Sequence, residues 1–212
     1  MNYDKEPTVF IVEDNEDARE ALCFLFDSVR LKTETYPSGD EFLKHYEPER
    51  LGCLIVDVRM PGISGLELHK ELIAQNALIP IIIITAHADV PMAVRAMKAG
   101  AFDFLDKPVN DELLLERVRQ AIEYDKQRRQ EECKRQQLLE RLEQLTPREY
   151  EVMKKMLQGN STKVIAYDLN ISHKTVETHR GQIMRKMQAK NVAELVRIGM
   201  GCERTIKFLY RE

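Results

Sequence analysis

The sequence predicts two folded units: a doubly wound α/β unit on a parallel five-stranded sheet and, after a helical linker, a smaller all-helical unit. Three observations support this division of the 212 residues. Apolar runs alternate with helical patterns over residues 1–125, and only helical patterns follow. The net charge is −11 over residues 1–125 and +6 over residues 146–212. Such asymmetry indicates an acidic regulatory or metal-binding part joined to a part that meets nucleic acid.

Unbroken apolar runs predict strands that are buried on both faces, as in a parallel sheet covered by helices. The clear runs are residues 9–12, 53–56 and 81–84, and weaker candidates are residues 33–36 and 101–105. Two S-x-x-E capping boxes, at Ser38 and Ser64, begin helices between them. Alternating strands and helices of this length predict a doubly wound sheet with its ligand site at the carboxyl edge of the strands.

Polar residues follow these predicted strands. Glu13 and Asp14 end the first, Asp57 the third and Thr85 the fourth, while Lys107 follows the fifth. Any one of them has an ordinary explanation, since aspartate alone is frequent in turns. Together they place three carboxylates, a hydroxyl and an ammonium on one rim. Clustered carboxylates repel each other unless a cation joins them, and Mg²⁺ prefers oxygen ligands. Phosphoryl transfer needs the same groups.

Four motifs in this order resemble the receiver domain of bacterial two-component response regulators, a flavodoxin-like fold. They are the acidic pair Glu13-Asp14, Asp57 with the MPGISG that begins at Met60, Thr85-Ala86, and MKAGAFDFLDKP, which ends at Pro108. The resemblance covers residues 8–124. Dehalogenase-like phosphatases also use an aspartyl nucleophile, but their D-x-D motif has Arg59 in its last position here. We therefore expect a regulator and not an enzyme.

The resemblance implies that Asp57 accepts a phosphoryl group from a sensor histidine kinase. The implied roles are Mg²⁺ binding by Glu13 (mainly through water), Asp14, Asp57 and the main-chain carbonyl of Arg59, phosphate binding by Thr85 and Lys107, and switching by Thr85 and Phe104. A cis bond between Lys107 and Pro108 is implied as well. Glu13 stands where aspartate is common, and Phe104 lacks the hydroxyl of the more usual tyrosine.

Residues 126–145 are expected to form a helical linker between domains at 1–125 and 146–212. The segment DKQRRQEECKRQQ, residues 125–137, has almost no apolar residue and consists mostly of good helix formers, which predicts a solvated helix. Leucines return at positions 138, 139, 142 and 145. They fit a short coiled-coil seam or a helix packed on its own neighbour equally well.

The last part begins with a capping box at Thr146 and proline in the first helical turn. Helical patterns follow at residues 149–157, 162–169 and 173–187, with a tight turn at 170–172. Two short helices around such a turn predict a helix-turn-helix, whose second helix enters the major groove of DNA.

The stretch 145–196 resembles the LuxR-type helix-turn-helix, and ISHKTVETHR resembles the FixJ subgroup of response regulators. This resemblance implies four helices, the third reading DNA and the last pairing dimers. With the apolar side of residues 173–187 turned inward, the outer face holds Lys174, Glu177, Thr178, Gly181 and Arg185. The candidate DNA-binding residues are Lys174, Thr175, Glu177, Thr178, Arg180 and Arg185. Arg180 projects nearer the core, where it fits either a structural ion pair or a phosphate contact.

We therefore expect a transcription factor that is phosphorylated on Asp57 and binds inverted-repeat promoter DNA as a dimer. Its expected partners are a sensor kinase, double-stranded DNA, a second copy and RNA polymerase. Four widely spaced cysteines, no secretory signal and no long apolar stretch predict a cytoplasmic protein without membrane contact. One alternative is a constitutive DNA-binding regulator whose receiver serves only for dimerisation. Another alternative is a phosphoryl-transfer relay that never binds DNA. The positive net charge of residues 146–212 argues against it.

Overall fold

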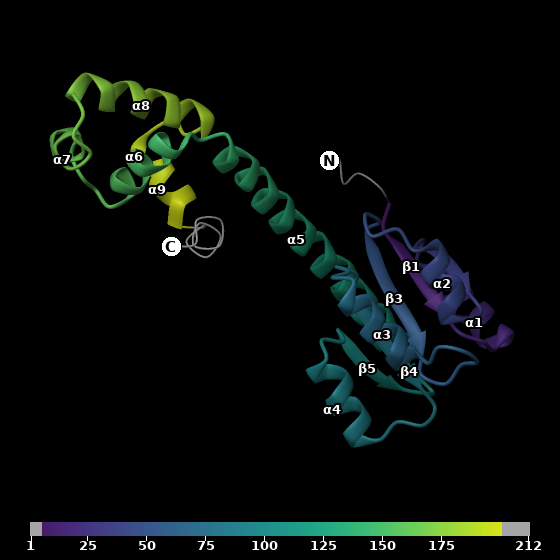
Figure 1. Ribbon diagram of the computed structural model, residues 1–212. Coiled ribbons are helices and arrows are strands. Elements are labelled where there is room, and N and C mark those ends of the chain that lie inside the picture. The colour runs from purple at the N-terminus through teal and green to yellow at the C-terminus, as the bar shows by residue number, and fades with distance from the viewer. Residues whose placement is uncertain (1–5, 201–212) are drawn as a thin grey trace. The chain divides into compact units, whose positions relative to one another are not determined.

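A computed structural model describes residues 6–200 of the chain (Figure 1). The chain divides into two compact units, residues 1–131 and residues 132–212. Cys202 and the stretch 202–212, for which the sequence predicts no role, lie outside the described residues, as do residues 1–5.

Within residues 6–131, five parallel strands form one sheet in the order β2-β1-β3-β4-β5. The strands are β1 Thr8–Val12, β2 Lys32–Tyr36, β3 Gly52–Asp57, β4 Ile81–Thr85 and β5 Asp103–Asp106. Every residue of β1, β3 and β4 is buried, as their unbroken apolar runs predict. The fifth strand lies two residues later than predicted at its start, because Ala101 and Phe102 lead into it.

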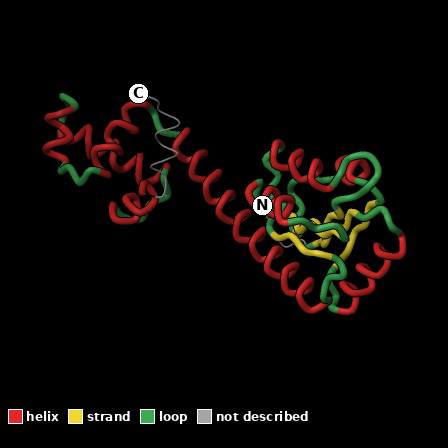
Figure 2. Tube along the Cα trace, turned by 90° about the horizontal axis from the view of Figure 1, so that it is seen from below, coloured by secondary structure: helices red, strands yellow, loops and turns green. Residues whose placement is uncertain are grey.

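Helices cover both faces of this sheet (Figure 2). They are α1 Glu16–Ser28, α2 Gly39–His45, α3 Gly65–Ala74, α4 Val90–Lys98 and α5 Asp111–Glu143. One core cluster joins the sheet to Phe42 of α2, Leu68 of α3 and Ala96 of α4. The cluster on the other face joins it to Phe26 of α1 and Val118 of α5. The predicted doubly wound α/β fold is confirmed.

The α5 helix runs through the predicted linker without a break, and its polar segment is not uniformly solvated. Asp125 is fully buried and accepts hydrogen bonds from the main-chain N–H of Gly52 at 2.9 Å and from Arg129 Nε at 2.8 Å. Arg129 is also buried and donates to the Pro48 carbonyl at 2.6 Å. Burial raises the pKa of the adjacent Tyr46 to about 12. These contacts attach α5 to the start of β3.

The second unit contains α6 Pro147–Leu157, α7 Thr162–Asp168, α8 His173–Lys186 and α9 Val192–Met200. Thr146 caps α6 in a capping box with Glu149, and Ser172 caps α8. Val152, Ile165 and Ile183 meet in the core of this unit. The predicted four-helix arrangement is confirmed, with each predicted helix within two residues of its observed bounds.

Leucines at the end of α5 and just after it belong to the core of the second unit. Leu142 and Leu145 are buried there, and Leu138 packs against the same cluster. Of the two alternatives for these leucines, the structure shows packing against neighbouring helices. The domain boundaries at residues 125 and 145 remain a prediction. None of the helices among residues 6–200 combines the length and hydropathy that a membrane span requires.

We expect Leu142→Ala to lower the free energy of unfolding of the second unit by about 2–5 kcal/mol, because it removes a buried side chain and leaves a cavity. Hydrogen exchange of the α6 and α8 amides in the full chain would report the change. Leu139→Ala, at a half-exposed neighbouring position, provides the matched control and should change exchange much less. Equal effects of the two substitutions would contradict the placement of Leu142 in this core.

Candidate phosphoacceptor site and nucleic-acid interface

The predicted rim residues lie together at the carboxyl edge of the sheet. Strands β1 and β3 are neighbours, and from them the strand order proceeds towards opposite edges of the sheet. Open α/β sheets bind their ligands at the carboxyl ends of the strands at such a switch point. Glu13 follows β1 directly and Asp57 ends β3. Lys107 follows β5, and its main-chain N–H donates to the Thr85 carbonyl at 2.8 Å. The Lys107–Pro108 bond is cis, as the receiver resemblance implies.

The Lys107 ammonium joins two carboxylates from different strands. Its Nζ lies 2.6 Å from Glu13 Oε2 and 2.9 Å from Asp57 Oδ2. Glu13 is 1% exposed and Asp57 is 9% exposed. Burial by itself lowers the pKa of Lys107, but the two carboxylates more than offset this effect and hold that pKa above its ordinary value. The lysine is therefore protonated at neutral pH.

Asp14 completes an acidic cluster with these two residues. One carboxylate oxygen from each of Glu13, Asp14 and Asp57 lies within 4.8 Å of the other two. Three carboxylates against one ammonium leave an excess of negative charge, and all the donors are oxygen atoms. This donor set fits a hard divalent cation such as Mg²⁺. The main-chain N–H of Arg59 donates to Asp57 Oδ1 at 3.3 Å, whereas metal binding by the Arg59 carbonyl remains a prediction.

Thr85 and Phe104 lie on strands β4 and β5, which follow β3 in the sheet. Thr85 is buried at the end of β4, and its Oγ1 accepts a hydrogen bond from the main-chain N–H of His87 at 3.2 Å. The hydroxyl proton of Thr85 remains available for donation, because a hydroxyl can accept and donate at once. Phe104 is half-buried in β5 against the core cluster that contains Ala96. The switching roles of both residues stay predictions.

The MPGISG segment, residues 60–65, packs against the main chain of Asp57. Ser64 caps α3 in a capping box with Glu67. The following Gly65 packs so closely that an added Cβ would lie 2.2 Å from the main-chain oxygen of Asp57. This glycine is part of the MPGISG motif, but the sequence does not predict its role, because the close approach exists only in the folded loop.

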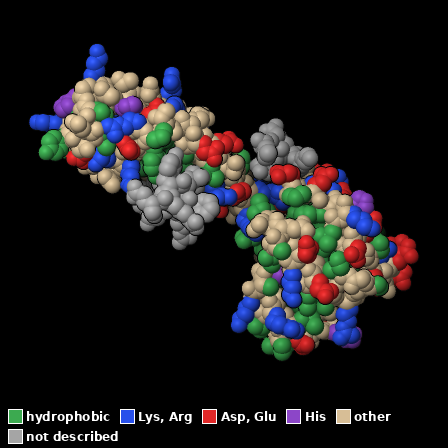
Figure 3. Space-filling model, in the orientation of Figure 1, with side chains coloured by type: hydrophobic (Ala, Val, Ile, Leu, Met, Phe, Trp, Pro, Cys, Tyr) green, Lys and Arg blue, Asp and Glu red, His purple; other side chains and the backbone are tan. Residues whose placement is uncertain are grey.

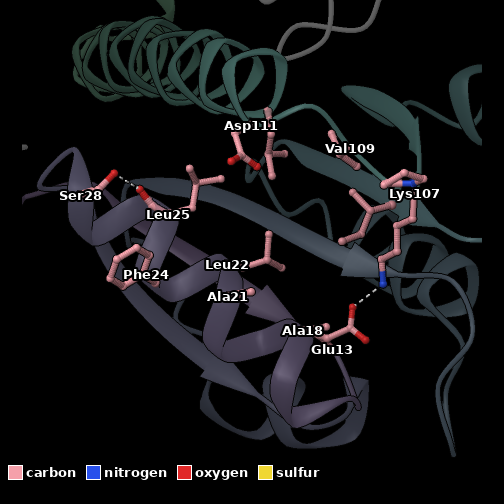
Figure 4. Close-up of a pocket in the computed structure, with 13 residues that line it drawn as sticks. Glu13, Ala18, Ala21, Leu22, Phe24, Leu25, Ser28, Lys107, Val109 and Asp111 are labelled. Carbon is pink, nitrogen blue, oxygen red and sulfur yellow. Dashed lines mark hydrogen bonds and ion pairs between the residues drawn. The ribbon is translucent and has the colours of Figure 1, made fainter.

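A groove of about 650 Å³ opens beside the site. Figure 4 shows Ala18, Ala21 and Leu22 of α1 along one side and Val109 opposite, with the Glu13–Lys107 ion pair at one end. Phe24 also lines the groove and is 80% exposed. Sequence patterning did not identify this surface, because the apolar residues of α1 look like ordinary core positions.

The outer face of α8 carries the predicted DNA-binding side chains. Val176, Ile183 and Met187 are buried, as the projection requires. Lys174, Thr175, Glu177, Thr178, Gly181 and Arg185 are all exposed. Lys and Arg side chains project from the surface of the second unit in Figure 3.

Several of these side chains have partners within the second unit. Glu177 Oε1 accepts from the Thr162 hydroxyl of α7 at 2.7 Å, and Arg180 Nε lies 3.8 Å from the same oxygen. Thr178 Oγ1 donates to the Lys174 carbonyl at 3.0 Å. The Thr175 hydroxyl lies 2.8 Å from Ser172 Oγ at the helix cap. Arg180 thus takes part in an ion pair, and a further phosphate contact stays a prediction.

The fold and these two sites define a protein that joins an acidic rim on an α/β sheet to a helix-turn-helix. Residues 9–119 match the family model of the response regulator receiver domain, and residues 143–198 match that of the luxR family of bacterial regulatory proteins. The chain therefore belongs to the two-component response regulators that join a receiver domain to a LuxR-family DNA-binding domain and regulate transcription.

Relatives of full length support this assignment. The chain is 44% identical over 190 residues to nodulation protein W of Bradyrhizobium diazoefficiens, covering 90% of this chain and 84% of that protein. It is 42% identical over 192 residues to the transcriptional regulatory protein FixJ of Azorhizobium caulinodans, covering 91% of each. Among solved structures, the response regulator StyR matches with a TM-score of 0.86 at 42% identity, over 92% of this chain and 99% of that chain. Full-length FixJ of B. japonicum matches with a TM-score of 0.58 at 38% identity, over 94% and 98%.

We expect Gly65→Ala to displace the main chain at Asp57 and to lower the free energy of unfolding by about 1–3 kcal/mol, as overpacking does. Denaturant unfolding of the full chain would measure this change. Gly39→Ala is the matched control, because its added Cβ meets nothing nearer than 3.3 Å. A Gly65→Ala protein as stable as the control would show that the loop has room to move.

Proposed function

We propose that Asp57 accepts a phosphoryl group and that this modification controls DNA binding by the second unit. The supporting observation is the ammonium of Lys107 held between Asp57 and Glu13 beside an acidic cluster. An attacking oxygen, a cation for the phosphoryl oxygens and donors for a divalent ion are the groups that phosphoryl transfer uses. They lie where the sheet places its ligands.

In the proposed reaction, a carboxylate oxygen of Asp57 attacks the phosphorus atom of a phosphohistidine. The phosphorus–nitrogen bond breaks, and the imidazole nitrogen keeps its electron pair and takes up a proton. Lys107 then exchanges its contact with Asp57 Oδ2 for a phosphoryl oxygen while Glu13 continues to hold the ammonium. The Thr85 hydroxyl donates its free proton to a second phosphoryl oxygen.

Asp14, Asp57 and the Arg59 carbonyl would hold Mg²⁺ directly, with Glu13 acting mainly through water. When bound, the ion neutralises charge on the phosphoryl oxygens. A sensor histidine kinase is the proposed donor. The groove between α1 and the start of α5 supports this choice, because an apolar groove can seat a helix of another protein and this one ends at Glu13 and Lys107.

The α4 face is the proposed contact between two phosphorylated receivers. Val90, Val94 and Met97 are 76%, 44% and 45% exposed, and their spacing of four and three places them on one stripe. Phe104 lies on β5, the strand next to α4. The dianionic phosphoryl group on Asp57 would draw in Thr85 and leave space for Phe104, which would alter this face.

The α8 helix is proposed to lie in the major groove of inverted-repeat DNA. Lys174 and Arg185 would contact phosphates and fix the register. The Thr178 hydroxyl is bonded to the Lys174 carbonyl, so its methyl group remains for thymine. Glu177 can accept a hydrogen bond from cytosine N4 while its carboxylate also contacts Thr162 and Arg180. Because the proposed function is to regulate transcription, RNA polymerase is a further proposed partner once the protein is bound to DNA.

We expect acetyl phosphate with Mg²⁺ to label the wild-type chain at one residue and to leave Asp57→Asn unlabelled, because the substitution removes the attacking oxygen. Intact mass and radiolabel incorporation measure the outcome. Asp106→Asn, at the end of strand β5 of the same sheet, is the control and should be labelled. Full labelling of Asp57→Asn would refute the acceptor assignment. An Asp57→Asn protein that dimerises and binds DNA like the phosphorylated wild type would favour the constitutive alternative.

Phosphorylation is expected to raise the mass of the wild-type protein in sedimentation from that of a monomer towards that of a dimer. Val94→Arg should prevent this shift, because it places a charge in the proposed apolar contact. Ile73→Arg on α3 changes an equally exposed side chain on another helix and should leave the shift intact. If Val94→Arg dimerises like wild type, the contact lies elsewhere.

We expect Lys174→Ala to weaken binding to all DNA sequences and to reduce the salt-dependence slope by about 1, because it removes one phosphate contact. Thr178→Ala should change the preference at one base per half-site by about 1–3 kcal/mol. Selection from random DNA and salt titrations measure these effects, with the exposed Lys154→Ala of α6 as a control. Identical selected motifs for wild type, Glu177→Ala and Thr178→Ala would exclude base reading by this face.

A further inference from the structure

Arg19 of α1 contacts the loop that carries two residues of the acidic cluster. Its Nη1 donates to the main-chain carbonyl of Glu13 at 2.8 Å and to that of Asp14 at 3.2 Å. These carbonyls belong to the peptide groups on either side of Asp14. One guanidinium therefore fixes the main chain both before and after this residue.

The three carboxylates of the cluster are held in different ways. Glu13 is buried and bonded to Lys107. Asp57 ends a buried strand and contacts both Lys107 and the Arg59 N–H. Asp14 is exposed, and within residues 6–200 no hydrogen bond or ion pair holds its carboxylate. Its place in the cluster therefore depends on its main chain.

The cluster itself works against that placement, because its carboxylates repel one another. A loop free to move would carry Asp14 away from Glu13 and Asp57. Hydrogen bonds from a charged donor are stronger than neutral ones, and the planar guanidinium presents its donors in a fixed geometry. Arg19 supplies such bonds and also brings a positive charge to the edge of the cluster.

We propose that Arg19 is a positioning residue for divalent-cation binding, which holds the loop between β1 and α1 so that Asp14 faces Glu13 and Asp57. The inference rests on the proposed function, since it concerns the metal of that site. Groups that orient the ligands of a metal commonly contribute 10- to 100-fold in affinity, about 10-fold being the lower end.

The test is a titration of the full-length chain with Mn²⁺ as the probe, in which electron paramagnetic resonance measures the free ion. Arg19→Met should raise the dissociation constant about 10-fold. Arg119→Met, which removes an exposed arginine of α5, is the matched control and should bind like wild type. Arg19→Lys keeps the charge without the planar fork and should fall between them. Thermal unfolding without metal checks folding, and if Arg19→Met does not fold, Arg19→Lys decides alone.

Phosphorylation by acetyl phosphate over a range of Mg²⁺ concentrations gives the second measurement. A positioning role predicts that Arg19→Met is slow at low Mg²⁺ and approaches the wild-type rate at saturating Mg²⁺. A rate reduced by the same factor at every concentration, or Mn²⁺ affinity equal to that of Arg119→Met, overturns the inference. Asp14→Asn separates the two proposals: if it binds Mn²⁺ like wild type, the proposed metal site itself is wrong.

Discussion

The ion pairs of Lys107 are the interaction on which the acidic rim depends. The lysine follows β5, yet its ammonium reaches past β4 to Asp57 on β3 and to Glu13 after β1. It thus joins strand ends that are far apart in the sequence. A buried carboxylate such as Glu13 is unfavourable unless it is paired and hydrogen-bonded. The lysine satisfies this requirement and leaves enough negative charge at the rim to attract a cation.

The sequence predicts the rim well because it depends on local patterns. An unbroken apolar run predicts a buried strand, and the polar residue after it must then lie at the carboxyl edge of a parallel sheet. Glu13, Asp57 and Thr85 follow from this rule, whereas Lys107 follows the weaker strand candidate at residues 101–105. The inner face of α8 follows in the same way from the spacing of apolar residues. Boundaries differ by a residue or two where apolar residues outside the strand, such as the buried Ala101 and the half-buried Phe102, continue an apolar pattern.

Contacts between segments distant in sequence could not be predicted in this way. Asp125 and Arg129 stand four apart on a helix in a highly charged segment, which is also the pattern of a solvated ion pair. Their burial depends on Gly52 and Pro48, which precede them by more than 70 residues. Arg19 likewise looks like a surface residue of α1. The engagement of Glu177 by Thr162 requires the turn between α7 and α8 to be formed.

The two attachments of α5 also determine how such regulators can exchange their parts. Arg129 is buried in the first unit, whereas Leu138 packs in the second. Only residues 130–137, which are polar apart from Cys133, lie between Arg129 and Leu138. A hybrid that takes its sensing half from one regulator and its output half from another keeps both interiors whole when the two sequences are spliced within this window. Splicing at residue 125 would instead separate a buried aspartate from its arginine.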